Sequence, residues 1–89
     1  MKAILSVFAK DAKGIIAYIT AYLAEQDINI LDISQTLMQE YFTMIMLVDA
    51  SECKVPFAQL SQLLKDAGLK KGLVIRIQRE DIFNAMHRI

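Results

Sequence analysis

Hydrophobic positions in the first third of the chain recur with two periods, one typical of strands and one of helices. Residues 2–9 form a short apolar run bounded by charge, which is typical of a buried strand. Over residues 14–26, apolar side chains recur every three or four positions along one face, which predicts a helix. We expect Asp11, or the turn that follows it, to cap the N-terminus of this helix.

The middle of the chain predicts two strands joined as a hairpin. Residues 29–39 place apolar and polar side chains on opposite sides of a strand: Leu31, Ile33 and Leu37 against Asp32, Ser34 and Thr36. Residues 42–48 are apolar on both faces, as expected of a central strand covered on each side. Glu40 and Tyr41 are a poor signal for a tight turn, but a hairpin is the economical connection.

The last third predicts a helix, a strand and a short terminal helix. Pro56 suits the first turn of a helix and Gly68 suits its end. The apolar stripe between them consists of Phe57, Leu60, Leu64 and Ala67. Residues 73–78 alternate like a half-covered strand. Residues 80–89 begin with acidic and end with basic side chains, as the helix dipole favours, and space Ile82, Met86 and Ile89 at helical steps.

This order of elements predicts an α+β fold, the ferredoxin-like βαββαβ sandwich, as a single domain over residues 1–89. Two helices should cover one face of a four-stranded antiparallel sheet, with the first and third strands central. Arg76 and Arg79 discourage pairing at the fourth strand, whereas the second carries only Asp32 as a charge. We therefore expect the second strand to pair with another copy. The open face needs a cover if Met44, Met46 or Ile45 is exposed on it.

Composition narrows the classes of function. The chain has 89 residues, 55% of them hydrophobic, so it is expected to fold around one core. Ten basic and ten acidic side chains balance, which argues against a nucleic-acid partner. No apolar run approaches the ~18 residues of a membrane span. Cys53 is the single cysteine and can form no intrachain disulfide, which favours a reducing compartment and predicts the cytoplasm.

Catalytic and metal motifs are missing from the sequence. Cys53 and His87 are far apart and lack neighbouring ligands, so we predict no metal site. Glu80 and Asp81 suit a helix start better than a pair of acid–base catalysts. No glycine-rich phosphate loop occurs, and we predict neither catalysis nor a cofactor. An RNA-binding sheet would need exposed aromatic residues on its central strands, where Phe8 and Phe42 are expected to be core instead.

The connector before the first helix is the best candidate for binding. Asp11 and Gly14 stand where a helix N-terminus presents unpaired N–H groups that suit a ligand carboxylate. Alternatively, Asp11 caps the helix and Gly14 relieves the turn. The amide of Asn29 can bind an amino acid or stabilise a tight turn. Asp32 belongs either to a solvated face or to the polar wall of a pocket at a dimer interface.

Three segments together resemble the ACT domain, a small regulatory module that binds amino acids: residues 11–17 (DAKGIIA), 23–25 (LAE) and 28–30 (INI). Residues 29–44 (NILDISQTLMQEYFTM) are the most specific match, and the resemblance covers essentially the whole chain. The subgroup it resembles is the stand-alone, largely uncharacterised single-ACT proteins of prokaryotes. Similar segments open the glycine cleavage repressor and formyltetrahydrofolate deformylase.

ACT domains of this kind pair and hold small effectors between the first loop of one copy and the second strand of its neighbour. The resemblance therefore implies two groups of ligand-binding residues: Asp11, Lys13, Gly14 and Ile15 in the loop, and Asn29, Ile30 and Asp32 on the strand. It implies a homodimer that binds a small metabolite, with an amino acid as the expected class, and that neither catalyses a reaction nor binds nucleic acid or a membrane. Lys13 replaces the proline that often precedes the glycine, which loosens the loop and adds a cation. The alternative is a dimerisation module, paired with itself or an unknown enzyme or regulator, that has lost ligand binding.

Overall fold

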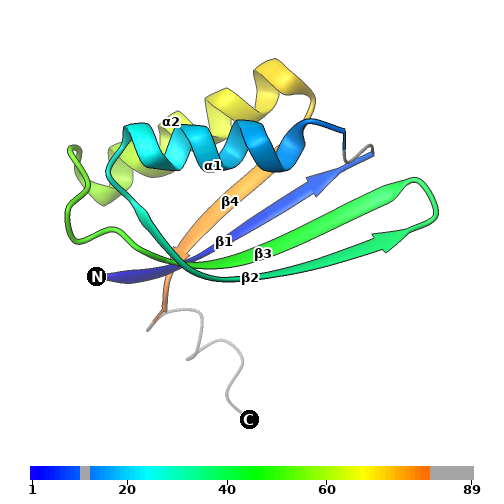
Figure 1. Cartoon of the computed structure of the whole chain (residues 1–89). Coiled ribbons are helices and arrows are strands. Elements are labelled where there is room, and N and C mark those ends of the chain that lie inside the picture. The colour runs from blue at the N-terminus through cyan, green and yellow to red at the C-terminus, as the bar shows by residue number, and fades with distance from the viewer. Residues whose placement is uncertain (11–12, 81–89) are drawn as a thin grey trace, which may run out of the picture.

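The computed structural model describes residues 1–10 and 13–80, which form a sheet with two helices against one of its faces (Figure 1). The elements are β1 (Lys2–Ala9), α1 (Ile15–Glu25), β2 (Asn29–Met38), β3 (Tyr41–Asp49), α2 (Phe57–Lys71) and β4 (Val74–Arg79). Their order confirms the ferredoxin-like sandwich. The terminal helix expected over residues 80–89 lies, beyond Glu80, outside the described residues.

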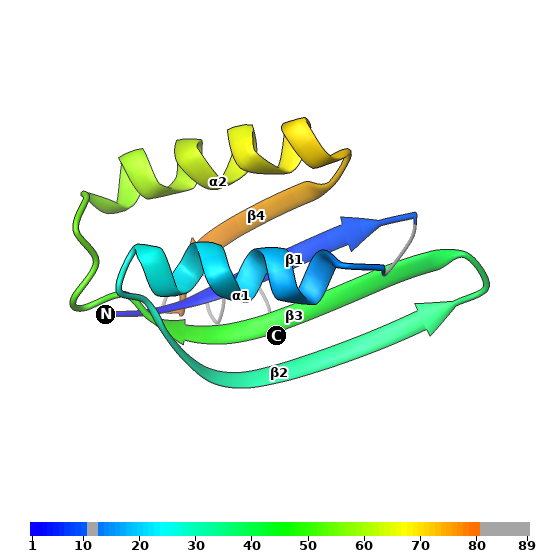
Figure 2. The same cartoon turned by 45° about the horizontal axis from the view of Figure 1, so that its top comes forward.

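The sheet is antiparallel, and its strands lie in the order β2-β3-β1-β4. The two most apolar strands, β1 and β3, are central as predicted, and β2 and β4 are the edges. Figure 2 shows α2 above β4 and α1 above the middle of the sheet, with β2 outermost. The hairpin between β2 and β3 is also confirmed, and its turn residue Gln39 has a φ of 55°.

One apolar core fills the space between the sheet and the helices. Alternate residues of each strand point into it, and every largest fully buried side chain belongs to a strand or to the inner face of a helix. These side chains are Leu5, Val7, Ile19, Leu23, Met44, Met46, Val48, Leu60 and Leu64. A buried leucine or isoleucine contributes ~1.5–3 kcal/mol to folding, so this layer dominates the stability of the fold.

The other face of the sheet, away from the helices, carries the alternate residues of the strands, and we call it the open face. The expectation that β3 is covered on both sides is wrong, because Ile45 points to the open face and is 42% exposed. Phe8 was expected in the core but is 44% exposed, since it alternates with buried Val7 and also points to the open face. Met44 and Met46 are buried against the helices.

The end of α2 also differs from the prediction. Gly68 does not terminate the helix but is buried inside it, and α2 continues to Lys71 with Gly72 as its C-cap. Gly72 has a φ of 71°, a left-handed conformation that glycine adopts without strain. Gly68 instead permits close packing, which a pattern of helix-ending residues cannot distinguish from termination.

The two sides of β2 follow the predicted alternation with one irregularity. Ile33 lies opposite the buried Met46 and Leu37 opposite the buried Phe42, so both belong to the helix side. The polar residues lie opposite open-face residues of β3. The register shifts between Ile30 and Asp32, so Leu31 falls at a bulge rather than within a continuous alternation.

Candidate functional site

The connector between β1 and α1 ends at Gly14, which is the N-cap of α1. Gly14 has a φ of 74°, and its carbonyl accepts the first helical hydrogen bond from the amide of Tyr18 at 3.1 Å. Among the described residues, no side chain caps the helix by a hydrogen bond, and no acidic residue lies in its first turn. The expected cap, Asp11, lies outside the described residues. The left-handed glycine, which most other residues adopt only with strain, makes the turn into α1.

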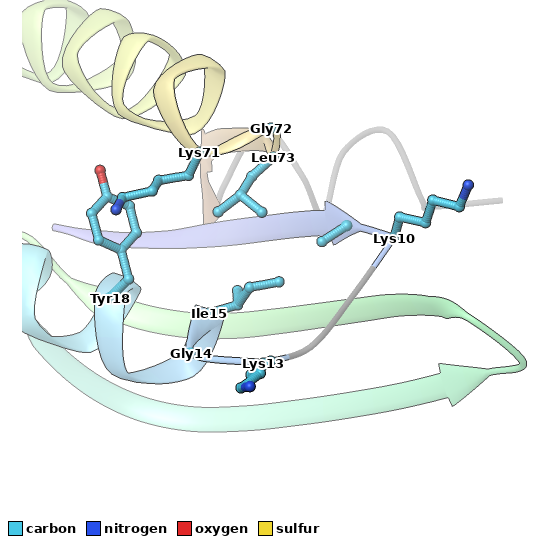
Figure 3. A pocket seen from close by; sticks show the side chains of 9 residues that line it. Lys10, Lys13, Gly14, Ile15, Tyr18, Lys71, Gly72 and Leu73 are labelled. Atoms are coloured by element: carbon cyan, nitrogen blue, oxygen red, sulfur yellow. The ribbon is translucent and has the colours of Figure 1, made fainter.

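A hollow of about 460 Å³ opens beside this connector, between the N-terminus of α1 and the C-terminus of α2. Its lining residues are Ala9, Lys10, Lys13, Gly14, Ile15, Tyr18, Lys71, Gly72 and Leu73. Figure 3 shows Ile15 and Leu73 pointing into this space, whereas Lys10 points away from it. The volume falls within the ~300–1,000 Å³ typical of small-molecule sites. The hollow can therefore hold a small metabolite against an apolar floor.

Tyr18 and Lys71 form one side of the hollow and join the two helices. The Tyr18 hydroxyl donates a 3.3 Å hydrogen bond to the carbonyl of Ala67 on α2. The Lys71 ammonium lies 5.1 Å from the centre of the Tyr18 ring, within the range of a cation–π contact (Figure 3). Lys13 and Lys71 lie at the hollow, and no acidic side chain is among its described lining residues. This hollow therefore favours a ligand that carries a negative group.

The structure brings together only the first group of predicted site residues. Lys13, Gly14 and Ile15 line the same hollow, while Asn29 lies in a separate shallow hollow with Asp27 and Glu52. The two hollows lie at opposite ends of α1, whose 11 residues span about 16 Å at ~1.5 Å each. Within one chain, the connector and Asn29 cannot contact the same small ligand.

The remaining predicted residues of β2 are not part of either hollow. Ile30 is half-buried and packs against the core. Asp32 is exposed, and its carboxylate accepts a 2.9 Å hydrogen bond from the amide of Ile33. Asp32 lies opposite Leu47, which places it on the open side of the sheet rather than beside the helices. A shared polar wall would need a second copy.

Sequence reasoning missed six lining residues as parts of the site: Ala9, Lys10, Tyr18, Lys71, Gly72 and Leu73. Three of them follow position 68, where α2 was expected to end, so the last turn of α2 was never placed beside the connector. A signal was present: two lysines followed by glycine at positions 70–72 are a common helix C-terminus.

Two properties of residues 1–10 and 13–80 bear on other classes of function. In this part of the chain, no group of three or more His, Cys, Asp or Glu side chains is arranged to hold a metal ion. Nor does this part contain a helix with the length and hydrophobicity that a membrane span requires. Cys53 is half-buried against the core.

Comparison with known proteins identifies the family. The model of the ACT domain matches residues 2–78. The chain belongs to the ACT domain family. An ACT domain protein from Streptococcus pneumoniae has a similar structure, with a TM-score of 0.84, 42% identity and 93% coverage of both chains.

Two relatives of this ACT domain have nearly the same length as the chain. A UPF0237 protein of Clostridium acetobutylicum is 56% identical over 89 residues, which cover 100% of both chains. A UPF0237 protein of Methanocaldococcus jannaschii is 51% identical over 88 residues, 99% of this chain and 98% of that one. A formyltetrahydrofolate deformylase from Pseudomonas putida shares the fold over 88% of this chain and 28% of its own, with a TM-score of 0.75 at 15% identity.

Proposed function

We propose that this ACT domain is a regulatory module that binds a small metabolite, with an amino acid as the first candidate, and acts as a homodimer in the cytoplasm. It performs no chemistry of its own. The observation that carries the proposal is the 460 Å³ hollow at the connector. Gly14 lines this hollow, and because it has no side chain it leaves space there for a ligand. A ligand carboxylate there would lie near Lys71 and the N-terminal amides of α1.

The exposed edge of β2 supports the homodimer. β2 lies at the edge of the sheet, and three of its apolar side chains are exposed: Leu31 at 43%, Ile33 at 38% and Leu37 at 65%. An edge strand with apolar side chains and a single charge is a template for pairing with another strand. β4, the other edge, carries Arg76 and Arg79 instead.

The register of the sheet makes pairing along β2 compatible with a shared site. Ala9, Phe42 and Leu37 lie in one row across β1, β3 and β2, and Ala9 leads into the connector. Asn29 lies at the other end of β2, opposite Asp49. Two β2 strands related by a twofold axis perpendicular to the sheet run antiparallel, so Asn29 of a second copy would lie beside the end of β2 nearest the connector. A dimer would thus bring together residues that one chain keeps about 16 Å apart.

Ligand binding would act by population shift. A ligand held between two copies stabilises the paired form in proportion to its preference for that form. The paired and unpaired forms would then present different surfaces to an enzyme or regulator. No covalent change of the ligand is involved.

The test combines titration calorimetry with measurement of mass in solution. We expect the chain to have the mass of a dimer and to release or absorb heat with at least one amino acid at millimolar concentration. Gly14→Asn, which tolerates the left-handed turn, should abolish this heat because its side chain would enter the hollow, while Lys65→Ala, an exposed change on α2, should not. Flat traces with every amino acid would overturn the proposed ligand class.

The second candidate is a dimerisation module without a ligand. Lys13 favours it, because the resemblance expects proline at this position and the connector lacks that restraint. This candidate predicts a dimer whose mass and stability do not change with any metabolite, and whose pairing is lost in Asp32→Lys.

A further inference from the structure

A groove of about 500 Å³ lies between α2 and the edge strand β4. One side of it is a stripe of α2 residues spaced four positions apart, Ser61, Lys65 and Leu69. Ile75 and Ile77 of β4 line it from below and are buried, whereas Leu69 is 70% exposed. Figure 2 shows α2 following β4 along the side of the sheet opposite to β2. The groove therefore has an apolar floor and opens to solvent beside a strand edge.

The edge of β4 can accept another strand. β4 pairs with β1 on one side, and within the described sheet no strand lies on its other side. An edge of this kind presents backbone N–H and C=O groups that an extended segment can pair with. A strand added there would lie ~4.8 Å from β4, and its alternate side chains would point towards α2. In such an addition the backbone supplies affinity and the groove supplies selectivity.

Two cations line the groove, one on each of its elements. Lys65 belongs to α2, and Arg76 belongs to β4, where it alternates with buried residues and so lies on the open face. Both side chains are exposed. Among the described residues, neither forms an ion pair with an acidic side chain. The charges along the groove therefore favour a segment that carries carboxylates.

We propose that the groove binds an extended, acidic segment of a partner protein by adding it to β4 as a further strand. Residues directly opposite each other on paired strands project to the same face. A residue opposite Arg76 would place its carboxylate on the open face, and a neighbouring residue would place one beside Lys65. At the start of β4, an aliphatic side chain would cover Leu69 and Val74, which are 70% and 51% exposed. β4 has 6 residues, so a segment of about six residues can pair along it.

The charge on β4 also distinguishes this partner from a second copy of the chain. Two paired β4 strands would bring the Arg76 side chains of both copies to the same edge, and like charges on paired strands are destabilising. An acidic segment would gain attraction at the same position. Arg76 thus discourages pairing of β4 with itself without closing the edge to an acidic partner.

The groove and the connector hollow can be tested separately. Leu73 is the residue common to the two sets of lining residues. Lys65→Ala should weaken binding of the acidic segment and leave the heat of amino-acid binding unchanged. Gly14→Asn should have the opposite effects. Failure of either proposal would therefore be recognised without the other.

Selection of displayed random eight-residue peptides against the full chain tests the chemistry of the segment. We expect enrichment of peptides with at least two acidic residues beside an aliphatic one. Arg76→Glu should weaken binding of a selected peptide ~10-fold or more. Lys70→Glu is the matched control, because Lys70 is exposed on α2 and is not among the residues that line the groove. Absence of enrichment, enrichment of basic peptides, or equal losses in the two variants would overturn the proposal.

Backbone methylation of a selected peptide tests the strand addition itself. In a β ladder, every second residue directs its N–H to the partner strand. Methylation of one alternate set of amides should abolish binding, while methylation of the other set should leave most of it. Equal effects of the two sets would overturn addition to β4. A change in the mass of the free chain on Arg76→Glu would overturn it as well, because the edge would then belong to a second copy.

Discussion

The carbonyl oxygen of Leu73 lies where a side chain at position 68 would have to begin. An ideal Cβ built on Gly68 would be 2.9 Å from this oxygen and 3.0 Å from Cγ1 of Ile75. Gly68 and Leu73 are also joined by a 2.7 Å hydrogen bond, which the Leu73 amide donates to the Gly68 carbonyl. The last turn of α2 thus rests directly on the backbone that enters β4, and this contact positions Lys71 and Gly72 at the hollow.

Gly68→Ala should destabilise the protein although alanine is the better helix former. The added methyl would force the backbone of Leu73 away, and overpacking of this kind typically costs ~1–3 kcal/mol in the free energy of unfolding. Helix propensity would return at most ~1 kcal/mol. Urea denaturation measures the balance. Lys65→Ala, an exposed change on the same helix, should stay within ~0.5 kcal/mol of the wild type, and a stabilised Gly68→Ala variant would contradict the close contact.

The fold was predictable because the spacing of apolar residues determines both the type of each element and the face that it buries. The alternation around Ile75 and Ile77, and the helical spacing of Ile19 and Leu23, both recur in the buried core. Gly68 was misread because a glycine after an apolar stripe signals either a helix end or a close approach. The packing of β4 against α2 distinguishes the two roles, and this packing is a tertiary contact that the local sequence does not show.

The candidate site was only partly predictable for the same reason. Local chemistry identified Gly14 as the start of α1, and the structure places it in a hollow. Tyr18 and Lys71 are far apart in the sequence, and their contact depends on how α1 and α2 pack. A site shared by Asn29 and the connector would depend on a second chain, because the two lie at opposite ends of α1 within one chain.

Gly14 should be more sensitive to backbone conformation than to the size of its side chain. A Cβ at this position would have nothing within 4 Å, but the φ of 74° is unfavourable for alanine. Gly14→Ala should therefore cost ~1–2 kcal/mol in the free energy of unfolding. Gly14→Asn should cost less, because asparagine tolerates the left-handed region better. Thermal denaturation of both variants provides the comparison, and equal losses would argue against a conformational role.

Leu37→Lys should weaken the proposed dimer. Leu37 is 65% exposed on β2 in a single chain, so a lysine there costs little to the monomer but places like charges near the pairing edge of both copies. We expect the mass in solution, measured by light scattering, to fall towards that of one chain. Leu69→Lys is the matched control, because Leu69 is 70% exposed on α2, away from the β2 edge. Equal effects of the two variants would argue against pairing through β2.

Asp49 anchors the end of β3 to the residues around it. Its carboxylate accepts hydrogen bonds from the Ser51 hydroxyl and, at 2.9 Å, from the Ser51 amide. The N-terminal ammonium of Met1 lies 3.3 Å from the same oxygen. The two hydrogen bonds from Ser51 contribute most and, with the N-terminal ammonium, lower the pKa of Asp49 from its usual 3.8 to about 2, against an opposing effect of desolvation. The contacts thus favour the ionised carboxylate in the folded protein.

The stability that Asp49 contributes should therefore disappear in acid. Because its pKa is lower in the folded than in the unfolded chain, the contribution is complete above about pH 4 and is lost as the pH falls towards about 2. In urea denaturation, the difference between wild type and Asp49→Asn should narrow across this interval. Ser51→Ala removes the largest cause of the low pKa and should shift the narrowing to higher pH. A difference that stays constant from pH 5 to pH 2 would show that Asp49 titrates alike in the folded and unfolded states, which would contradict the hydrogen-bond network described for it.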